Sequence, residues 1–225
     1  HTKIVMTQRL TWAVLLLTAA SISALTLRAT RRKQRRPATT RKLIASKKRA
    51  SGFSVWLMPS STVDKDLTAL LDETTSASGS NSFVPHVTLV GGFGVEHGEE
   101  EVLRVFRSMS YSSLPRPATK LNFENISIGP KHFRALYSPV ADVPAWFTKL
   151  RKAVLSEFDG MYDKDLPDPH LSLCYTEERS DAVEALKAAM TSSIHLTRME
   201  GWEFTRVELW RTTGRFEDWV KLDER

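Results

Sequence analysis

Two stretches of this sequence repeat one short pattern: FVPHVTLV at residues 83–90 and DPHLSLCY at residues 168–175. Each contains Pro, His, an aliphatic residue, a hydroxyl residue and Leu, in that order. Because side chains two residues apart point to the same side of a strand, each stretch predicts a strand with one imidazole and one hydroxyl on a single face. The aliphatic residue between them, Val87 or Leu171, points to the opposite face, toward a core.

The pairs that share a face are His86 with Thr88 and His170 with Ser172. A single His-x-Thr on a strand is most often a packed histidine beside a hydroxyl. Two copies in matching surroundings point to function instead. If the two strands lie side by side, two imidazoles and two hydroxyls line one cleft.

The segments around these strands predict an α+β fold built from two similar lobes. After residue 52 the expected order is strand, helix, strand, helix, two strands, helix, strand, helix, two strands, so the second half copies the first in outline. A hairpin is expected around Gly129-Pro130 and another near the end of the chain. Apolar residues at helical spacing mark the first, second and fourth helices: Val63, Leu67, Leu70 and Leu71; Val102, Val105, Phe106 and Met109; Val183, Leu186 and Met190. Each lobe then contributes one histidine strand to a site at their seam.

The charge of the chain is unevenly distributed. Residues 1–50 hold 13 of the 32 Lys and Arg residues and no Asp or Glu, so residues 51–225 carry 19 basic and 26 acidic side chains, a balance of −7. A mildly acidic folded part argues against a groove that follows a long nucleic acid. The one cysteine, Cys174, excludes an internal disulfide and fits a reducing compartment.

Residues 1–50 are expected to be a targeting or anchoring leader, and residues 51–225 the catalytic domain. The apolar stretch 10–27 is short for a bilayer span and is typical of the apolar part of a signal peptide. The basic, acid-free segment after it has the composition of an organelle transit peptide. Such two-part leaders occur in algae with complex plastids. A signal anchor that contacts the membrane through residues 10–27 and holds the domain on the cytoplasmic side is the competing hypothesis; a basic tail that binds acidic lipid or RNA ranks lowest.

Two histidines and two hydroxyls suit the hydrolysis of a phosphodiester. In-line attack needs a base on the water and an acid on the departing oxygen, on opposite sides of phosphorus. Imidazoles supply both near neutral pH, since their ordinary pKa is about 6.5. The hydroxyls of Thr88 and Ser172 would donate hydrogen bonds to the non-bridging oxygens. This scheme requires no metal and no other cofactor.

Two other kinds of site fit these residues less well than this scheme. A zinc site lacks further ligands, because His97, His132 and His195 have no metal-ligand spacing; we expect His97 and His132 in surface loops. Cys174 lies on the same face as His170 and could be a nucleophile, but its place one step beyond the hydroxyl favours packing.

With both motifs, the chain resembles the 2H phosphoesterase superfamily, and within it the cyclic phosphodiesterases known from plants and yeast. The resemblance covers residues 53–225: FSVWLMP at 53–59 is similar to their first strand, and the two histidine stretches to their H-x-[T/S] motifs. It implies a bilobal, pseudo-twofold fold with two antiparallel sheets around a central cleft and helices outside. It also implies a metal-independent enzyme of the 2′,3′-cyclic-nucleotide 3′-phosphodiesterase type. The implied substrates are ADP-ribose 1″,2″-cyclic phosphate, a by-product of tRNA splicing, and nucleoside 2′,3′-cyclic phosphates.

By position in that family, Trp56 and Tyr175 are expected on the substrate side, where a flat ring could stack on a base. The other aromatic residues considered, Tyr137, Trp202, Trp210 and Trp219, are expected in the core. One segment departs from the expected pattern: Lys131 to Arg134 is more polar than a strand of this family, which leaves the substrate preference open.

Three functions remain open from the sequence. The first is hydrolysis of small cyclic nucleotides by a monomer. The second is a related 2H enzyme that acts on RNA ends, similar to a 2′-5′ ligase. The third is a leader-anchored nucleotide-binding protein that no longer catalyses a reaction, against which the intact motifs argue.

Overall fold

The structure is a computed structural model that describes residues 51–110, 119–162, 166–192 and 201–225. The expected leader, including its apolar stretch 10–27, lies outside the described residues, as does His195. Within the described ranges, no helix combines the length and the apolar character needed to cross a membrane.

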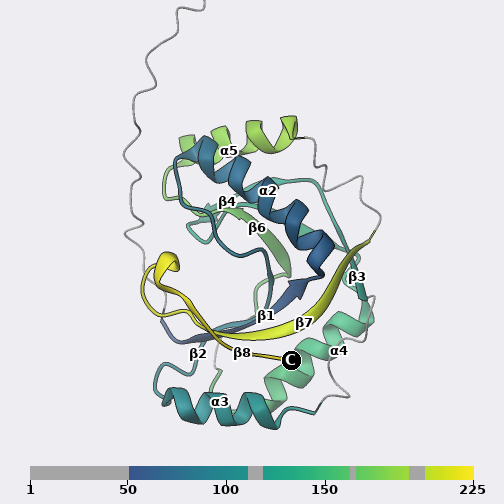
Figure 1. Cartoon of the computed structure of the whole chain (residues 1–225), viewed down its shortest axis with the longest axis vertical. Helices are drawn as coiled ribbons and strands as arrows, with labels where there is room; N and C mark the ends of the chain where they lie inside the picture. Colours follow the sequence, from purple (N-terminus) through teal and green to yellow (C-terminus); the bar gives the residue numbers. More distant parts are fainter. Residues whose placement is uncertain (1–50, 111–118, 163–165, 193–200) are drawn as a thin grey trace, which may run out of the picture. The chain divides into compact units, whose positions relative to one another are not determined.

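The described residues form eight strands, and every pairing between them is antiparallel. Six strands pair in a closed ring in the order β1, β2, β6, β5, β3, β7 and back to β1, while β8 extends from β7 and β4 from β5 (Figure 1). The bounds are β1 Phe53–Pro59, β2 Val87–Phe93, β3 Thr119–Phe123, β4 Ser127–Lys131, β5 Arg134–Ala141, β6 His170–Cys174, β7 Trp202–Arg211 and β8 Val220–Glu224.

The two expected sheets meet at the two histidine strands. The lobe of β1, β2, β7 and β8 joins the lobe of β4, β5 and β6 where Val87 on β2 pairs with Leu171 on β6. Both side chains are completely buried, as predicted for the residue between each histidine and hydroxyl. This alternation turns His86 and His170 away from the core and toward the space between the lobes.

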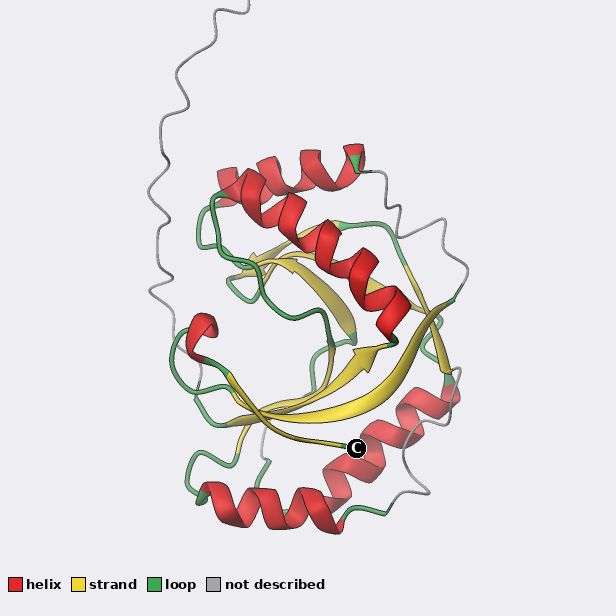
Figure 2. Ribbon diagram, in the orientation of Figure 1, coloured by secondary structure: helices red, strands yellow, loops and turns green. Residues whose placement is uncertain are grey.

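Helices cover the outside of both lobes (Figure 2). The bounds are α2 Ser61–Ser78, α3 Glu99–Ser108, α4 Ala145–Glu157 and α5 Arg179–Thr191. α2 lies against α5 and β6, whereas α4 lies against β2. α3 is tied to β8 by an ion pair between Arg107 and Asp223 at 2.7 Å. Each histidine strand is therefore covered by a helix from the other half of the chain, an exchange that the order of elements did not predict.

The predicted inner face is confirmed for α2 and only in part for α5, where Leu186 is half-buried against the core. Val63, Leu67, Leu70 and Leu71 of α2 are all buried. In α5 the buried residues are Ala182, Ala185 and Ala189, and Met190 is 66% exposed. Alanine has a small side chain that lets neighbouring backbones approach closely, so the buried face of α5 is its small face and not its most apolar one.

The hairpin expected around Gly129-Pro130 also differs. Both residues lie inside β4, and the turn between β4 and β5 is His132-Phe133, flanked by the pair Lys131 and Arg134. A Cβ at Gly129 would collide with the carbonyl of Arg134, so glycine is needed for the close approach of β4 to β5. Glycine here marks a close contact inside the sheet and not the turn.

Candidate active site

The two histidines hold equivalent positions at the seam: His86 immediately precedes β2, and His170 is the first residue of β6. The Nδ1 atom of each ring lies 2.7 Å from the carbonyl oxygen two residues earlier, that of Val84 or Asp168. Because a carbonyl only accepts, each Nδ1 must carry the hydrogen, and each neutral ring keeps its lone pair on Nε2. Both rings are thus prepared to exchange a proton through Nε2.

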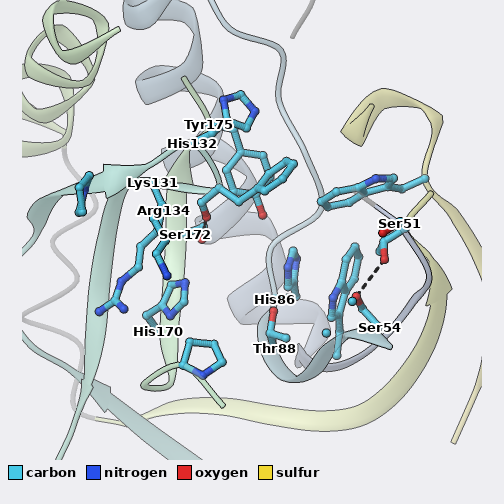
Figure 3. Close-up of a pocket in the computed structure, with 18 residues that line it drawn as sticks. Ser51, Ser54, His86, Thr88, Lys131, His132, Arg134, His170, Ser172 and Tyr175 are labelled. Atoms are coloured by element: carbon cyan, nitrogen blue, oxygen red, sulfur yellow. Dashed lines mark hydrogen bonds between the residues drawn. The ribbon is translucent and has the colours of Figure 1, made fainter. Parts of the chain in front are cut away.

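A cavity of about 600 Å³ lies between the lobes (Figure 3). All six residues predicted for the site line it: Trp56, His86, Thr88, His170, Ser172 and Tyr175. The structure therefore brings the two motifs, far apart in the sequence, to one cavity.

His86 is the more deeply buried of the two rings, with 5% of its surface exposed. It stacks on Trp56, with ring centroids 3.7 Å apart and the planes within 8° of parallel. Burial lowers the pKa of His86 to about 4; the hydrogen bond to Val84 opposes this shift, and the charge of His170 adds to it. His86 is therefore neutral at pH 7, and its lone pair can accept a proton.

His170 is partly exposed at the cavity wall. Burial lowers the pKa of His170 too, the hydrogen bond to Asp168 opposes this, and the positive charges of Arg134 and Arg151 lower the pKa further. These two charges also attract anions, and a bound anion favours the protonated imidazole. A negatively charged ligand would therefore convert His170 toward a proton donor.

The hydroxyls of the two motifs differ in their contacts. Ser172 Oγ donates to the carbonyl of Phe133 at 3.1 Å and is also hydrogen-bonded to the Tyr175 side chain. A hydroxyl carries one hydrogen, so Ser172 must release Phe133 before it can donate to a phosphate. Among the described residues, the hydroxyl of Thr88 has no hydrogen-bond partner, so Thr88 can donate without rearrangement.

The geometry does not offer Trp56 and Tyr175 as free stacking surfaces. One face of Trp56 is covered by His86 and the other by Trp210, whose ring centroid is 4.5 Å away. Tyr175 is 4% exposed and stacks on Phe83 at 3.9 Å. Stacking of a nucleobase on Trp56, as expected from the sequence, conflicts with these contacts; the ring instead supports His86.

Two residues expected elsewhere line the cavity. His132, expected in a surface loop, is 4% exposed, and Trp219, expected in the core, is half-buried at the cavity wall. The ring of Phe133, in the β4–β5 turn, contacts both residues: its centroid lies 4.6 Å from that of His132 and 5.6 Å from that of Trp219. The β4–β5 turn therefore forms part of the cavity wall, which a turn expected at Gly129-Pro130 did not indicate.

Cys174 has the packing role that its position predicted. It is completely buried and hydrogen-bonded to Ser78 at 3.3 Å and Ser80 at 3.6 Å. Burial raises the pKa of the thiol, which disfavours the nucleophilic thiolate. In the described part of the chain, no group of three or more His, Cys, Asp or Glu side chains is placed to hold a metal ion.

A comparison with protein families matches residues 51–225 to the family described as cyclic phosphodiesterase-like protein. The chain belongs to this family. It is therefore a 2H phosphoesterase of the cyclic phosphodiesterase-like type, as its two motifs indicated.

Solved structures give more distant similarities, and no curated protein is a significant match. The E. coli LigT crystal structure complexed with 3′-AMP is 11% identical, covers 79% of this chain and 98% of its own, and superposes with a TM-score of 0.49. A crystal structure described as a phosphoesterase is 12% identical, covers 78% of this chain and 97% of its own, with a TM-score of 0.48.

Arg151 connects the two motifs of this cyclic phosphodiesterase-like protein. From α4, its Nε donates to the carbonyl of Leu89, directly after the first motif, at 2.7 Å. One of its terminal nitrogens donates to the carbonyl of Pro167, just before the second motif, also at 2.7 Å. One guanidinium therefore fixes the backbone on both sides of the seam. Because its partners are carbonyls of distant segments, no sequence motif could identify it.

Replacing Arg151 by methionine is expected to lower kcat by at least about tenfold, because misplacing a catalytic group by 1 Å costs on the order of 100-fold. Loss of the positive charge also raises the pKa of His170, so the limb of the pH–rate profile that reports His170 moves to higher pH. Arg151→Lys keeps the charge and restores part of kcat. Lys149→Met, on the same helix but exposed, serves as the control. An unchanged kcat and pH profile in Arg151→Met would remove this role.

Proposed function

We propose that the protein hydrolyses cyclic phosphodiesters of small nucleotides by two-histidine acid–base catalysis without a metal ion. Membership of the cyclic phosphodiesterase-like family supports the reaction class. The observation that carries the proposal is the matched pair of Nδ1 hydrogen bonds, which leaves two Nε2 atoms available in one cavity. The substrates proposed are nucleoside 2′,3′-cyclic phosphates and ADP-ribose 1″,2″-cyclic phosphate.

In this mechanism the two rings have opposite protonation states. Nε2 of neutral His86 takes a proton from water, and the resulting hydroxide attacks phosphorus. The P–O3′ bond of a 2′,3′-cyclic phosphate breaks, and the departing O3′ takes a proton from Nε2 of protonated His170. The product is a 2′-phosphate, and one proton has moved from His170 to His86. Exchange with solvent restores both rings.

The two pKa environments support this assignment of base and acid. His86 is nearly fully buried with a pKa lowered to about 4, so it is neutral over the physiological range. His170 is more exposed, and an anionic phosphate beside it favours its protonated form. The hydroxyls of Thr88 and Ser172 would stabilise charge on the non-bridging oxygens, Thr88 directly and Ser172 after leaving Phe133.

The proposal is tested by incubating the purified protein, in excess chelator, with three substrates: 2′,3′-cyclic AMP, ADP-ribose 1″,2″-cyclic phosphate, and an RNA that ends in a 2′,3′-cyclic phosphate. We expect the first two to be hydrolysed, with 2′-AMP as the product from cyclic AMP. His170→Ala protein, prepared identically, controls for contaminating phosphodiesterases.

Each other outcome has a definite meaning. Hydrolysis of the RNA alone would support the alternative that the protein is a 2H enzyme acting on RNA ends. Binding of the small nucleotides without turnover would support a non-catalytic binding protein. Activity that the chelator abolishes and a divalent metal restores would contradict the metal-independent mechanism.

A further inference from the structure

A buried carboxylate that the mechanism does not use lies beside the cavity wall. Glu208 of β7 is 2% exposed and is the cross-strand partner of Trp56, where β1 and β7 run side by side (Figure 1). A buried charge is destabilising unless it is paired and hydrogen-bonded. Because Trp56 lines the cavity and Glu208 does not, the carboxylate can act on the site only through its neighbours.

Both oxygens of this carboxylate are bonded. Oε1 forms an ion pair with Nε of Arg206 at 2.9 Å, and the ammonium of Lys221 lies 3.8 Å from the same oxygen. Oε2 accepts a hydrogen bond from Nε1 of Trp210 at 2.8 Å. A hydrogen bond to an ionised acceptor is stronger than one between neutral groups. The contacts at Oε1 therefore fix the carboxylate, and Oε2 fixes the indole of Trp210.

Trp210 begins a stack of three rings that ends at His86. The ring centroid of Trp210 lies 4.5 Å from that of Trp56, and the imidazole of His86 lies 3.7 Å from Trp56 on its other face. The hydrogen bond from Nδ1 to Val84 fixes one point of the imidazole but leaves the ring free to tilt about it. Contact with a flat indole that is itself held in place removes this tilt. The stack therefore sets the direction in which Nε2 of His86 points.

We propose that Glu208 and Trp210 are positioning residues for His86 and act through Trp56. The carboxylate orients Trp210, Trp210 backs Trp56, and Trp56 holds the imidazole in place and keeps water from its face. This inference rests on the proposed function, in which Nε2 of His86 takes a proton from water. It extends the set of residues on which that step depends to β7, outside both histidine motifs.

Trp210→Leu tests the stack, because it removes the indole that backs Trp56. With 2′,3′-cyclic AMP as substrate, kcat should fall at least about tenfold, since a displacement of 1 Å costs on the order of 100-fold. KM should change less than about threefold, because neither Trp210 nor Glu208 lines the cavity. Trp210→Phe, which keeps an aromatic face without the N–H, should recover part of kcat.

Glu208→Gln tests the carboxylate while keeping the shape of the side chain. The amide has a single oxygen, so one of the two contacts, with Arg206 or with Trp210, is lost. We expect kcat to fall by at least about threefold with KM unchanged. If circular dichroism shows that Trp210→Leu does not fold, Glu208→Gln decides the outcome.

Trp202→Phe is the matched control. Trp202 is also a buried tryptophan of β7, it packs on Phe123, and it lies outside the cavity lining. It should lower stability and keep kcat within about threefold of wild type. A loss of kcat in Trp202→Phe as large as in Trp210→Leu would assign the effect to general destabilisation and overturn the proposal. A wild-type kcat in folded Trp210→Leu or Glu208→Gln, or a change that appears in KM alone, would also overturn it.

A titration separates this inference from the proposed function. If the wild-type protein turns over neither proposed substrate, the proposed function fails, and the stack is then judged by nuclear magnetic resonance of the His86 imidazole. Burial lowers the pKa of His86 to about 4. Trp210→Leu admits water to the ring and should raise this pKa to about 5 or above. Identical titrations of His86 in the two proteins would contradict the proposal.

Discussion

Alanine at His86 or at His170 is expected to lower kcat by about 100- to 10,000-fold, the usual contribution of one proton transfer. Each substitution removes a ring whose Nδ1 is hydrogen-bonded to a backbone carbonyl, that of Val84 for His86 and that of Asp168 for His170. The Nε2 atom that this bond leaves available for proton transfer is lost with the ring. The measurement is kcat for 2′,3′-cyclic AMP at saturating substrate, with His97→Ala as a control. His97 lies outside the cavity lining and is bonded to exposed Glu101.

The two variants also test whether the histidines act together. Groups that act on one transition state are strongly non-additive, so the double variant should lose little more than the worse single one. His86→Ala leaves a gap against Trp56, and His86→Gln keeps more of that contact, so both are made and their circular dichroism is compared with the wild type. A kcat that stays within threefold of wild type in a folded variant would exclude that histidine from the chemistry.

A loss of stability of about 3 kcal/mol is expected as the pH falls from 6.5 to 4, because the pKa of His86 is about 4 in the folded protein and 6.5 in the unfolded chain. Between pH 4 and 6.5, His86 is mostly protonated in the unfolded chain and mostly neutral in the folded protein. Unfolding therefore takes up a proton, and the free energy of unfolding rises with pH across this range. The full contribution is present above pH 6.5. The lowered pKa of His170 adds a loss of the same sign.

Urea unfolding at several pH values measures this effect. His86→Gln should lower the slope of unfolding free energy against pH between 4 and 6.5, whatever its stability at pH 7. His97→Gln, which changes an imidazole outside the cavity, should keep the slope. An identical slope in His86→Gln and wild type would mean that His86 is not held neutral by burial.

The sequence predicted those parts of the fold that depend on local periodicity. The alternation around Val87 and Leu171, and the apolar spacing in α2, each define a buried face that holds in any compact structure. The repeated motif also predicted that His86 and His170 share one cavity. These features follow from the chain itself, since strand and helix geometry fix which side chains lie together.

The features that could not be predicted depend on contacts between distant segments. The buried face of α5 is its alanine face, which lets neighbouring backbones approach closely, although alanine is not the most apolar residue available. Arg151 donates to two backbone carbonyls, those of Leu89 and Pro167. Every residue has a backbone carbonyl, so the sequence does not indicate which ones Arg151 contacts. His132 lines the cavity from the β4–β5 turn, whose position the sequence did not indicate. The sequence showed that the segment from Lys131 to Arg134 is more polar than the corresponding strand of the family. It did not show that this segment lies beside His170 at the cavity.

The central claim is that His86 and His170 act on opposite sides of one phosphorus atom. A crystal structure with a nucleoside vanadate, which copies the five-coordinate transition state, tests it most directly. We expect Nε2 of His86 and Nε2 of His170 each to lie within about 3.2 Å of one of the two opposed apical oxygens. A vanadate bound with either Nε2 beyond hydrogen-bond reach, or with both rings on the same side, would contradict it.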